Sequence, residues 1–96
     1  MEPAQQRAKY LGIQKELIEI VDFHNIPVSA FYLDKLTTTS FENFKFYFPW
    51  FIGSGTVDEK LRNLFSKLGI KSTDYEPELI SHIHDLLEWL LILAEL

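Results

Sequence analysis

The chain has 96 residues, with nine Lys and Arg, fourteen Asp and Glu, a formal net charge of −5 and no cysteine. The absence of cysteine excludes a disulfide framework, a thiolate zinc site and a cysteine nucleophile. The negative net charge disfavours DNA and RNA as partners, because basic side chains supply most of the affinity for the phosphate backbone.

The excess negative charge belongs to the C-terminal part of the chain. Six acidic residues follow Lys71, and no Lys or Arg does. The longest apolar run, residues 89–94, is far shorter than the roughly 20 residues that span a bilayer, and the N-terminal residues lack a signal-peptide core. We expect a soluble, cytoplasmic protein without a membrane partner.

Residues 4–24 have the apolar spacing of an amphipathic helix. The residue before Pro27 is biased away from helical conformation, so this helix is predicted to end near Asn25. A short second helix is predicted over 27–36, with Pro27 in its first turn and Asn25 as its cap. The apolar stripe of the first helix consists of Tyr10, Leu11, Ile13, Leu17, Ile18, Ile20 and Val21.

The most demanding stretch is 41–51, which holds seven of the chain's fourteen aromatic residues. These rings bury large areas, so the flanking helices must pack around them or leave part of the cluster for a partner. A helix ending at Pro49 would place Phe41, Phe44 and Phe48 in the core. The residues left for an outside surface are then Phe46 first, followed by Tyr47, Trp50 and Phe51.

The same stretch also fits a strand, since aromatic residues alternate from Phe44 to Trp50. A strand would need a partner, and residues 26–33 are the only candidate for a small hairpin with 43–50. Pro27 weakens that pairing. We favour the helix and keep an α+β fold with this hairpin as the alternative.

A Gly-Ser-Gly turn at 53–55 comes before a capping box formed by Thr56 and Glu59. The helix it opens is predicted over 57–68, and Gly69 supplies the left-handed residue that ends it. This helix is expected to bury Val57, Leu61, Leu64, Phe65 and Leu68.

Pro77 opens the last helix, which is predicted to run to about Glu95. Its core face is Leu79, Ile83, Leu86, Leu90 and Leu93, widened by Ile80 and Leu87. The opposite row begins polar and ends apolar: Glu78, His82, Asp85, Trp89, Ile92 and Leu96. Such a helix needs cover on both sides over its final turns, from the aromatic cluster or from a second chain.

The predicted fold is all-α, a single compact domain over 1–96 with about five helices. The long first and last helices are expected to pack around the aromatic segment.

Three short segments, at 36–46, 61–65 and 84–87, are similar to the second, fourth and fifth helices of death-effector domains, which are six-helix adaptor modules. The similarity covers about half of the chain. Residues 83–86 read Ile-His-Asp-Leu in place of that family's Arg-x-Asp-Leu signature, so no functional residue is carried over.

Motifs for chemistry are sparse. Glu78 with His82, and His84 with Glu88, are spaced four apart on one helix, but each pair offers only two of the three or four ligands that a metal needs. No serine lies in a nucleophile elbow. We therefore predict no metal site, no cofactor and no enzymatic activity.

Two functions remain. The first is a protein-binding module, an inhibitor of the immunity or antitoxin type that masks the basic surface of a toxin or nuclease by charge steering and aromatic anchors. The second is a dimerising structural or adaptor protein with a symmetric contact through Trp89, Ile92 and Leu96. The predicted partner-binding residues are Phe46, Trp50, Glu76, Glu78, His82, Asp85, Glu88, Trp89 and Ile92.

Overall fold

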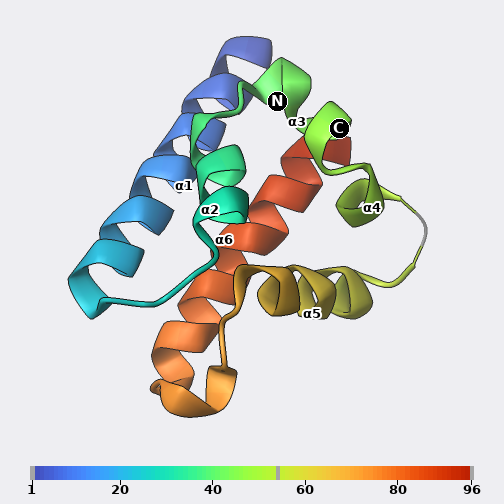
Figure 1. Cartoon of the computed structure of the whole chain (residues 1–96). Helices are drawn as coiled ribbons and strands as arrows, with labels where there is room; N and C mark the ends of the chain where they lie inside the picture. Colours follow the sequence, from blue (N-terminus) through green and yellow to red (C-terminus); the bar gives the residue numbers. More distant parts are fainter. Residues whose placement is uncertain (1, 54, 96) are drawn as a thin grey trace.

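The computed structural model describes residues 2–53 and 55–95, and over them every regular element is a helix (Figure 1). This confirms the all-α prediction, and the hairpin alternative at 26–33 and 43–50 is wrong, since no described residue lies in a strand. The elements in chain order are α1 (Pro3–His24), α2 (Ala30–Thr38), the 3-10 turn η1 (Phe41–Asn43), α3 (Phe44–Tyr47), α4 (Pro49–Ile52), α5 (Val57–Leu68), the 3-10 turn η2 (Ser72–Asp74) and α6 (Pro77–Glu95).

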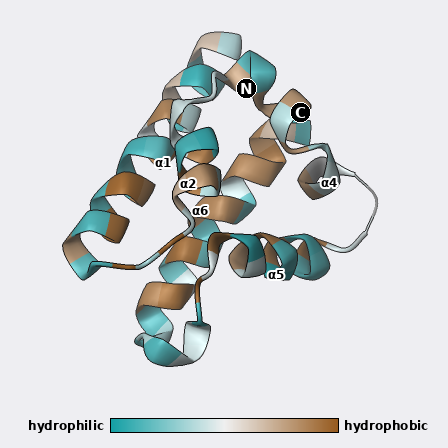
Figure 2. Ribbon diagram, in the orientation of Figure 1, coloured by the Kyte–Doolittle hydropathy of each residue, from teal (hydrophilic) through white to brown (hydrophobic). Residues whose placement is uncertain are grey.

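The two long helices, α1 and α6, contact each other directly and run in opposite directions (Figure 1). Helix α2 packs on α1, α5 packs on α2, and α6 packs on α5, so these four helices enclose one core. The short helices α3 and α4 cover the end of the core where α6 finishes. Figure 2 shows α6 as the most apolar long helix, whereas α1 and α5 alternate apolar and polar residues.

The turn after α1 explains why α2 begins later than predicted. Asn25 adopts the left-handed conformation (φ 51°), and its N–H bonds back to the last turn of α1. It therefore ends α1, as predicted, and does not cap α2. Ile26 is buried, and the Ser29 N–H donates to the carbonyl oxygen of Leu68 over 2.6 Å. These tertiary contacts hold 26–29 outside the helix until Ala30.

The aromatic segment is helical in two pieces. The backbone breaks at Phe48 (φ −129°, ψ 47°), and Pro49 begins α4 instead of ending the segment. The break turns Phe51 inward, so that it meets Phe44 at 6.2 Å between ring centroids while Phe48 stacks on Phe44 at 5.0 Å. Phe51 is therefore buried, against the prediction of an outside position, and Trp50 is half-buried.

Three predicted core residues are exposed. Leu11 and Ile18 lie at the edge of a narrower inner face of α1, which is centred on Tyr10, Ile13, Gln14 and Leu17. Val57 occupies the first position of α5 and faces solvent. The residues predicted to begin and end α5 are confirmed. The Thr56 hydroxyl accepts from the Glu59 N–H at 3.2 Å, and Gly69 is left-handed at φ 82°.

A buried polar contact joins α1 to the end of α2. The Gln14 side-chain amide donates to the carbonyl oxygens of Leu36 at 2.7 Å and Thr39 at 2.9 Å, and the Tyr10 hydroxyl donates to Thr39 at 3.0 Å. Carbonyls at a helix C-terminus have no partner within the helix, so a neighbouring helix must supply donors where water is excluded. Gln14 fills this role, although the predicted apolar stripe of this helix did not include it.

Burial of Tyr10 predicts a loss of stability in alkali. Desolvation raises the pKa of its hydroxyl well above the ordinary 10.0, although the Gln14 contact opposes part of that rise. Above about pH 10 the unfolded chain therefore binds fewer protons at this tyrosine than the folded chain does. The free energy of unfolding then falls by up to about 1.4 kcal/mol per pH unit. Urea unfolding of wild type and Tyr10→Phe should show a smaller alkaline decline in the variant. An equal decline in the free energy of unfolding for the two proteins would contradict the attribution to Tyr10.

None of the described helices combines the length and the apolar composition that crossing a membrane requires.

Candidate partner-binding surface

The outer side of α6 carries the row predicted from its spacing. Glu78, His82, Asp85, Trp89 and Ile92 are all exposed, while Leu96 lies outside the described residues. Trp89 is 39% and Ile92 41% exposed, so each has part of its apolar surface packed and part in solvent. Below, "the α6 row" means these five described residues together with Glu88, which is half-buried beside them.

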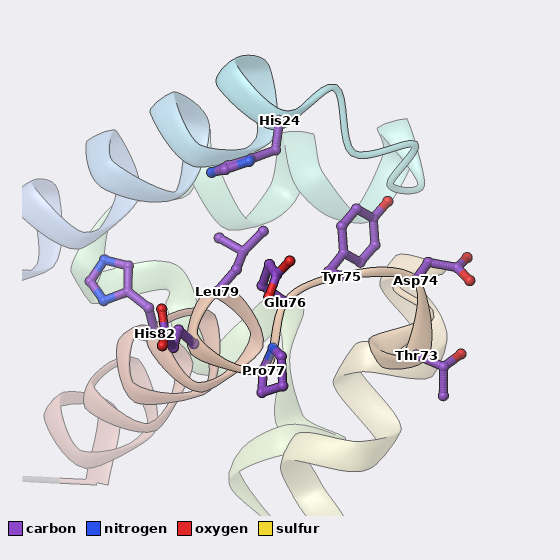
Figure 3. A pocket seen from close by; sticks show the side chains of 9 residues that line it. His24, Thr73, Asp74, Tyr75, Glu76, Pro77, Leu79 and His82 are labelled. Atoms are coloured by element: carbon purple, nitrogen blue, oxygen red, sulfur yellow. The ribbon is translucent and has the colours of Figure 1, made fainter.

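A wide, shallow depression of about 740 Å³ lies at the start of the row, between the end of α1 and the start of α6 (Figure 3). In Figure 3 the His24 ring and the side chains of Glu76 and Leu79 lie around the same space. The lining holds three carboxylates, two imidazoles and no Lys or Arg. It consists of His24, Thr73, Asp74, Tyr75, Glu76, Pro77, Glu78, Leu79 and His82. A cationic group is the ligand that this composition suits best.

His82 is already engaged with α1. Its Nε2 atom lies 2.7 Å from the Glu16 carboxylate, and both side chains are about half exposed. The pair links the two long helices at the rim of the depression, so a partner would meet His82 as a member of this pair.

A second depression, of about 260 Å³, lies further along the row. It is lined by four of the predicted residues: Asp85, Glu88, Trp89 and Ile92. The Lys9 ammonium lies 4.2 Å from the centroid of the Trp89 ring, which is the range of a cation–π contact. We call these four lining residues the acidic patch, since they combine two carboxylates with two apolar side chains.

The middle of α6 holds a cluster of His84, Asp85 and Glu88, of which the spacing in the sequence had shown only the His84–Glu88 pair. His84 Nδ1 lies 3.8 Å from a Glu88 carboxylate oxygen and 4.0 Å from an Asp85 carboxylate oxygen. The three ligand atoms lie within 4.8 Å of one another. Asp85 was missed as the third member because adjacent positions on a helix ordinarily diverge. These are the distances of ion pairs within one turn of α6, and the cluster is open to solvent at Asp85.

Phe46 and Trp50 do not belong to this surface. Phe46 projects from α3 and is 84% exposed, whereas Trp50 is half-buried in α4. The ring contacts recorded for Trp50 are with Tyr32, Phe48 and Phe51, and none of them joins the α6 row. The predicted site residues therefore do not form one surface.

The other predicted residues lie along α6, apart from Glu76, which directly precedes it. Three line the first depression and four the second: Glu76, Glu78 and His82, then Asp85, Glu88, Trp89 and Ile92. Comparisons with protein-family models, with curated proteins and with solved structures find no match to this chain.

Proposed function

We propose that the protein is a non-enzymatic binding module whose α6 row engages a basic surface of another protein. The supporting observation is the continuity of the row. Carboxylates surround both depressions, and the exposed Trp89 and Ile92 lie at the apolar end of the same helix. The row thus offers charge and apolar area to one partner on one rigid element.

The two parts of the row would act at different stages of binding. Glu78, Asp85 and Glu88, together with Glu76 just before the helix, would attract a cationic surface over distances of about a Debye length, which speeds the encounter. Trp89 then supplies the apolar anchor, because desolvated aromatic residues carry much of the affinity at interfaces. The net charge of −5 adds to the steering.

The partner class we favour is a toxin or nuclease with a basic cleft, inhibited in the manner of an immunity protein or antitoxin. A cleft that binds phosphate groups is lined with Lys and Arg, and a row of carboxylates on a small domain complements it. The protein would then act by covering the cleft.

Charge reversal tests this proposal. The double variant Glu78→Lys with Asp85→Lys should lose a basic partner that wild-type protein retains on affinity capture from its native host. The matched control, Glu19→Lys with Asp34→Lys, changes the net charge equally at exposed positions off the row and should retain the partner. The wild-type affinity, measured by titration calorimetry, should fall at least about tenfold between low and high salt. Retention by both double variants, or an affinity indifferent to salt, would refute the proposal.

A further inference from the structure

A second surface combines aromatic rings with lysines on the α2–α5 side of the molecule. Lys35 Nζ lies 4.6 Å from the Tyr47 ring centroid and 5.9 Å from that of Phe31. Lys67 Nζ lies 5.0 Å from the Trp50 centroid and 5.6 Å from that of Tyr32. We call these six residues the aromatic–lysine face: Phe31, Tyr32, Lys35, Tyr47, Trp50 and Lys67.

The face is continuous and partly uncovered. The Phe31 and Tyr32 rings meet edge-on at 5.2 Å, and Tyr32 meets Trp50 at 6.4 Å, so α2 and α4 are joined through ring contacts. Phe31 is 63% and Tyr47 50% exposed. Edge-to-face rings and stacked ammonium groups hold each other in place, which leaves the face with little to reorganise on binding.

The chemistry of the face favours an occupant with both carboxylates and apolar side chains. Two ammonium groups need anionic partners, and the uncovered parts of Phe31 and Tyr47 need apolar area. Single-stranded nucleic acid suits it poorly, because bases stack on ring faces that lysines here already cover.

The acidic patch on α6 has this composition. It presents the carboxylates of Asp85 and Glu88 beside the exposed Trp89 and Ile92. It also lies on a different side of the bundle, where α1 and α6 meet, as the Lys9–Trp89 and Glu16–His82 contacts show. One molecule can therefore use both surfaces at once.

We propose that the acidic patch of one copy docks on the aromatic–lysine face of a second copy, in a head-to-tail contact. Asp85 and Glu88 would meet Lys35 and Lys67, and Trp89 would pack beside Phe31. The contact joins different surfaces of the two copies, so it adds molecules into chains or rings and does not stop at a symmetric dimer. Repulsion between copies of net charge −5 is screened beyond about 8 Å at physiological ionic strength, whereas the local charge pairs are closer.

A symmetric contact through the same helix is less favourable. Helix α6 contains no Lys or Arg, so the carboxylates of two facing copies would gain no cation from the opposing helix. Lys9, the cation recorded beside the patch, already stacks on Trp89. Carboxylates that face carboxylates across a contact oppose association, because like charges repel. The head-to-tail contact gives each carboxylate a lysine.

This inference does not depend on the proposed function, because it concerns the purified chain alone. Light scattering of wild-type protein from low to high micromolar concentration should show a mass that rises above the monomer. Lys35→Glu with Lys67→Glu, and separately Asp85→Lys with Glu88→Lys, should each weaken association at least about tenfold. Mixing the two variants should restore pairing between one copy of each, since the intact acidic patch of the first fits the intact face of the second.

The control is Lys15→Glu with Lys71→Glu, which has the net charge of the first variant but changes exposed lysines elsewhere. It should associate like wild type, and circular dichroism should show all variants folded. Wild-type protein that stays monomeric would overturn the inference. So would association that survives in either of the two double variants alone, or a mixture of them that does not associate. Sedimentation of the wild-type chain with vesicles containing anionic lipid, lost in the Lys35→Glu, Lys67→Glu variant and without self-association, would also overturn it and assign the face to a lipid surface.

Discussion

Phe44→Ala is expected to lower the free energy of unfolding by about 3–5 kcal/mol, the range for removing a large aromatic side chain from a core. Phe44 is 0% exposed and contacts the rings of Tyr10, Phe48 and Phe51. Three elements meet at this ring: α1, the break after α3, and α4. Its loss leaves a cavity that these elements can close only by moving together. Urea unfolding followed by circular dichroism measures the change.

The same short helix contains the control. Phe46 lies two residues further on and is 84% exposed, so Phe46→Ala removes the same chemical group from solvent. It should change the free energy of unfolding by no more than about 0.5 kcal/mol. Equal effects of the two substitutions would show that the segment does not pack as described.

Gln14→Leu is expected to lower the free energy of unfolding by about 1–3 kcal/mol, although it replaces a polar core side chain with an apolar one of similar size. The Leu36 carbonyl oxygen would lose the Gln14 amide, whereas the Thr39 carbonyl oxygen would keep the Tyr10 hydroxyl as its donor. A buried acceptor without a donor costs about 1–3 kcal/mol. The apolar gain of leucine does not replace those bonds.

Tyr10→Phe provides the graded comparison. It removes one donor from the Thr39 carbonyl, which keeps the Gln14 amide, so the cost should be about 1 kcal/mol. Denaturant unfolding at neutral pH ranks the two variants. A Gln14→Leu protein as stable as wild type would show that the α2 carbonyls find other donors.

The helices that could be predicted from the sequence are those with local stop and start signals. Asn25 ends α1, Thr56 and Gly69 bound α5, and Pro77 opens α6. Each signal acts on its own neighbours in the chain, so a single sequence displays it. The start of α2 depends instead on the bond from Ser29 to Leu68, which joins distant segments and leaves no local mark.

The structure of the aromatic segment could not be predicted because it also depends on contacts between distant segments. Its period fits a helix or a strand, and the choice depends on what surrounds each ring. The break at Phe48 serves the packing of Phe51 on Phe44, and a helical wheel that assumes one continuous helix misplaces Phe51.

The candidate site was predicted in part. Spacing of four and three along one helix placed Glu78, Asp85 and Trp89 on one face, because α6 is regular throughout. Spacing could not show that Trp50 lies elsewhere, nor that Lys35 and Lys67 meet around aromatic rings from separate elements. Those contacts depend on the tertiary arrangement.

The direct packing of α1 on α6 also bears on how the chain folds during synthesis. Helix α1 leaves the ribosome before α6, and although α2 also packs on α1, the inner face that Ile13 and Leu17 present is fully covered only when α6 has followed. An isolated amphipathic helix gains most of its stability from such packing. The nascent chain therefore carries a partly uncovered apolar face on α1 until α6 has been made. The bundle closes by joining two helices far apart in the sequence, which slows folding relative to a bundle of neighbouring helices.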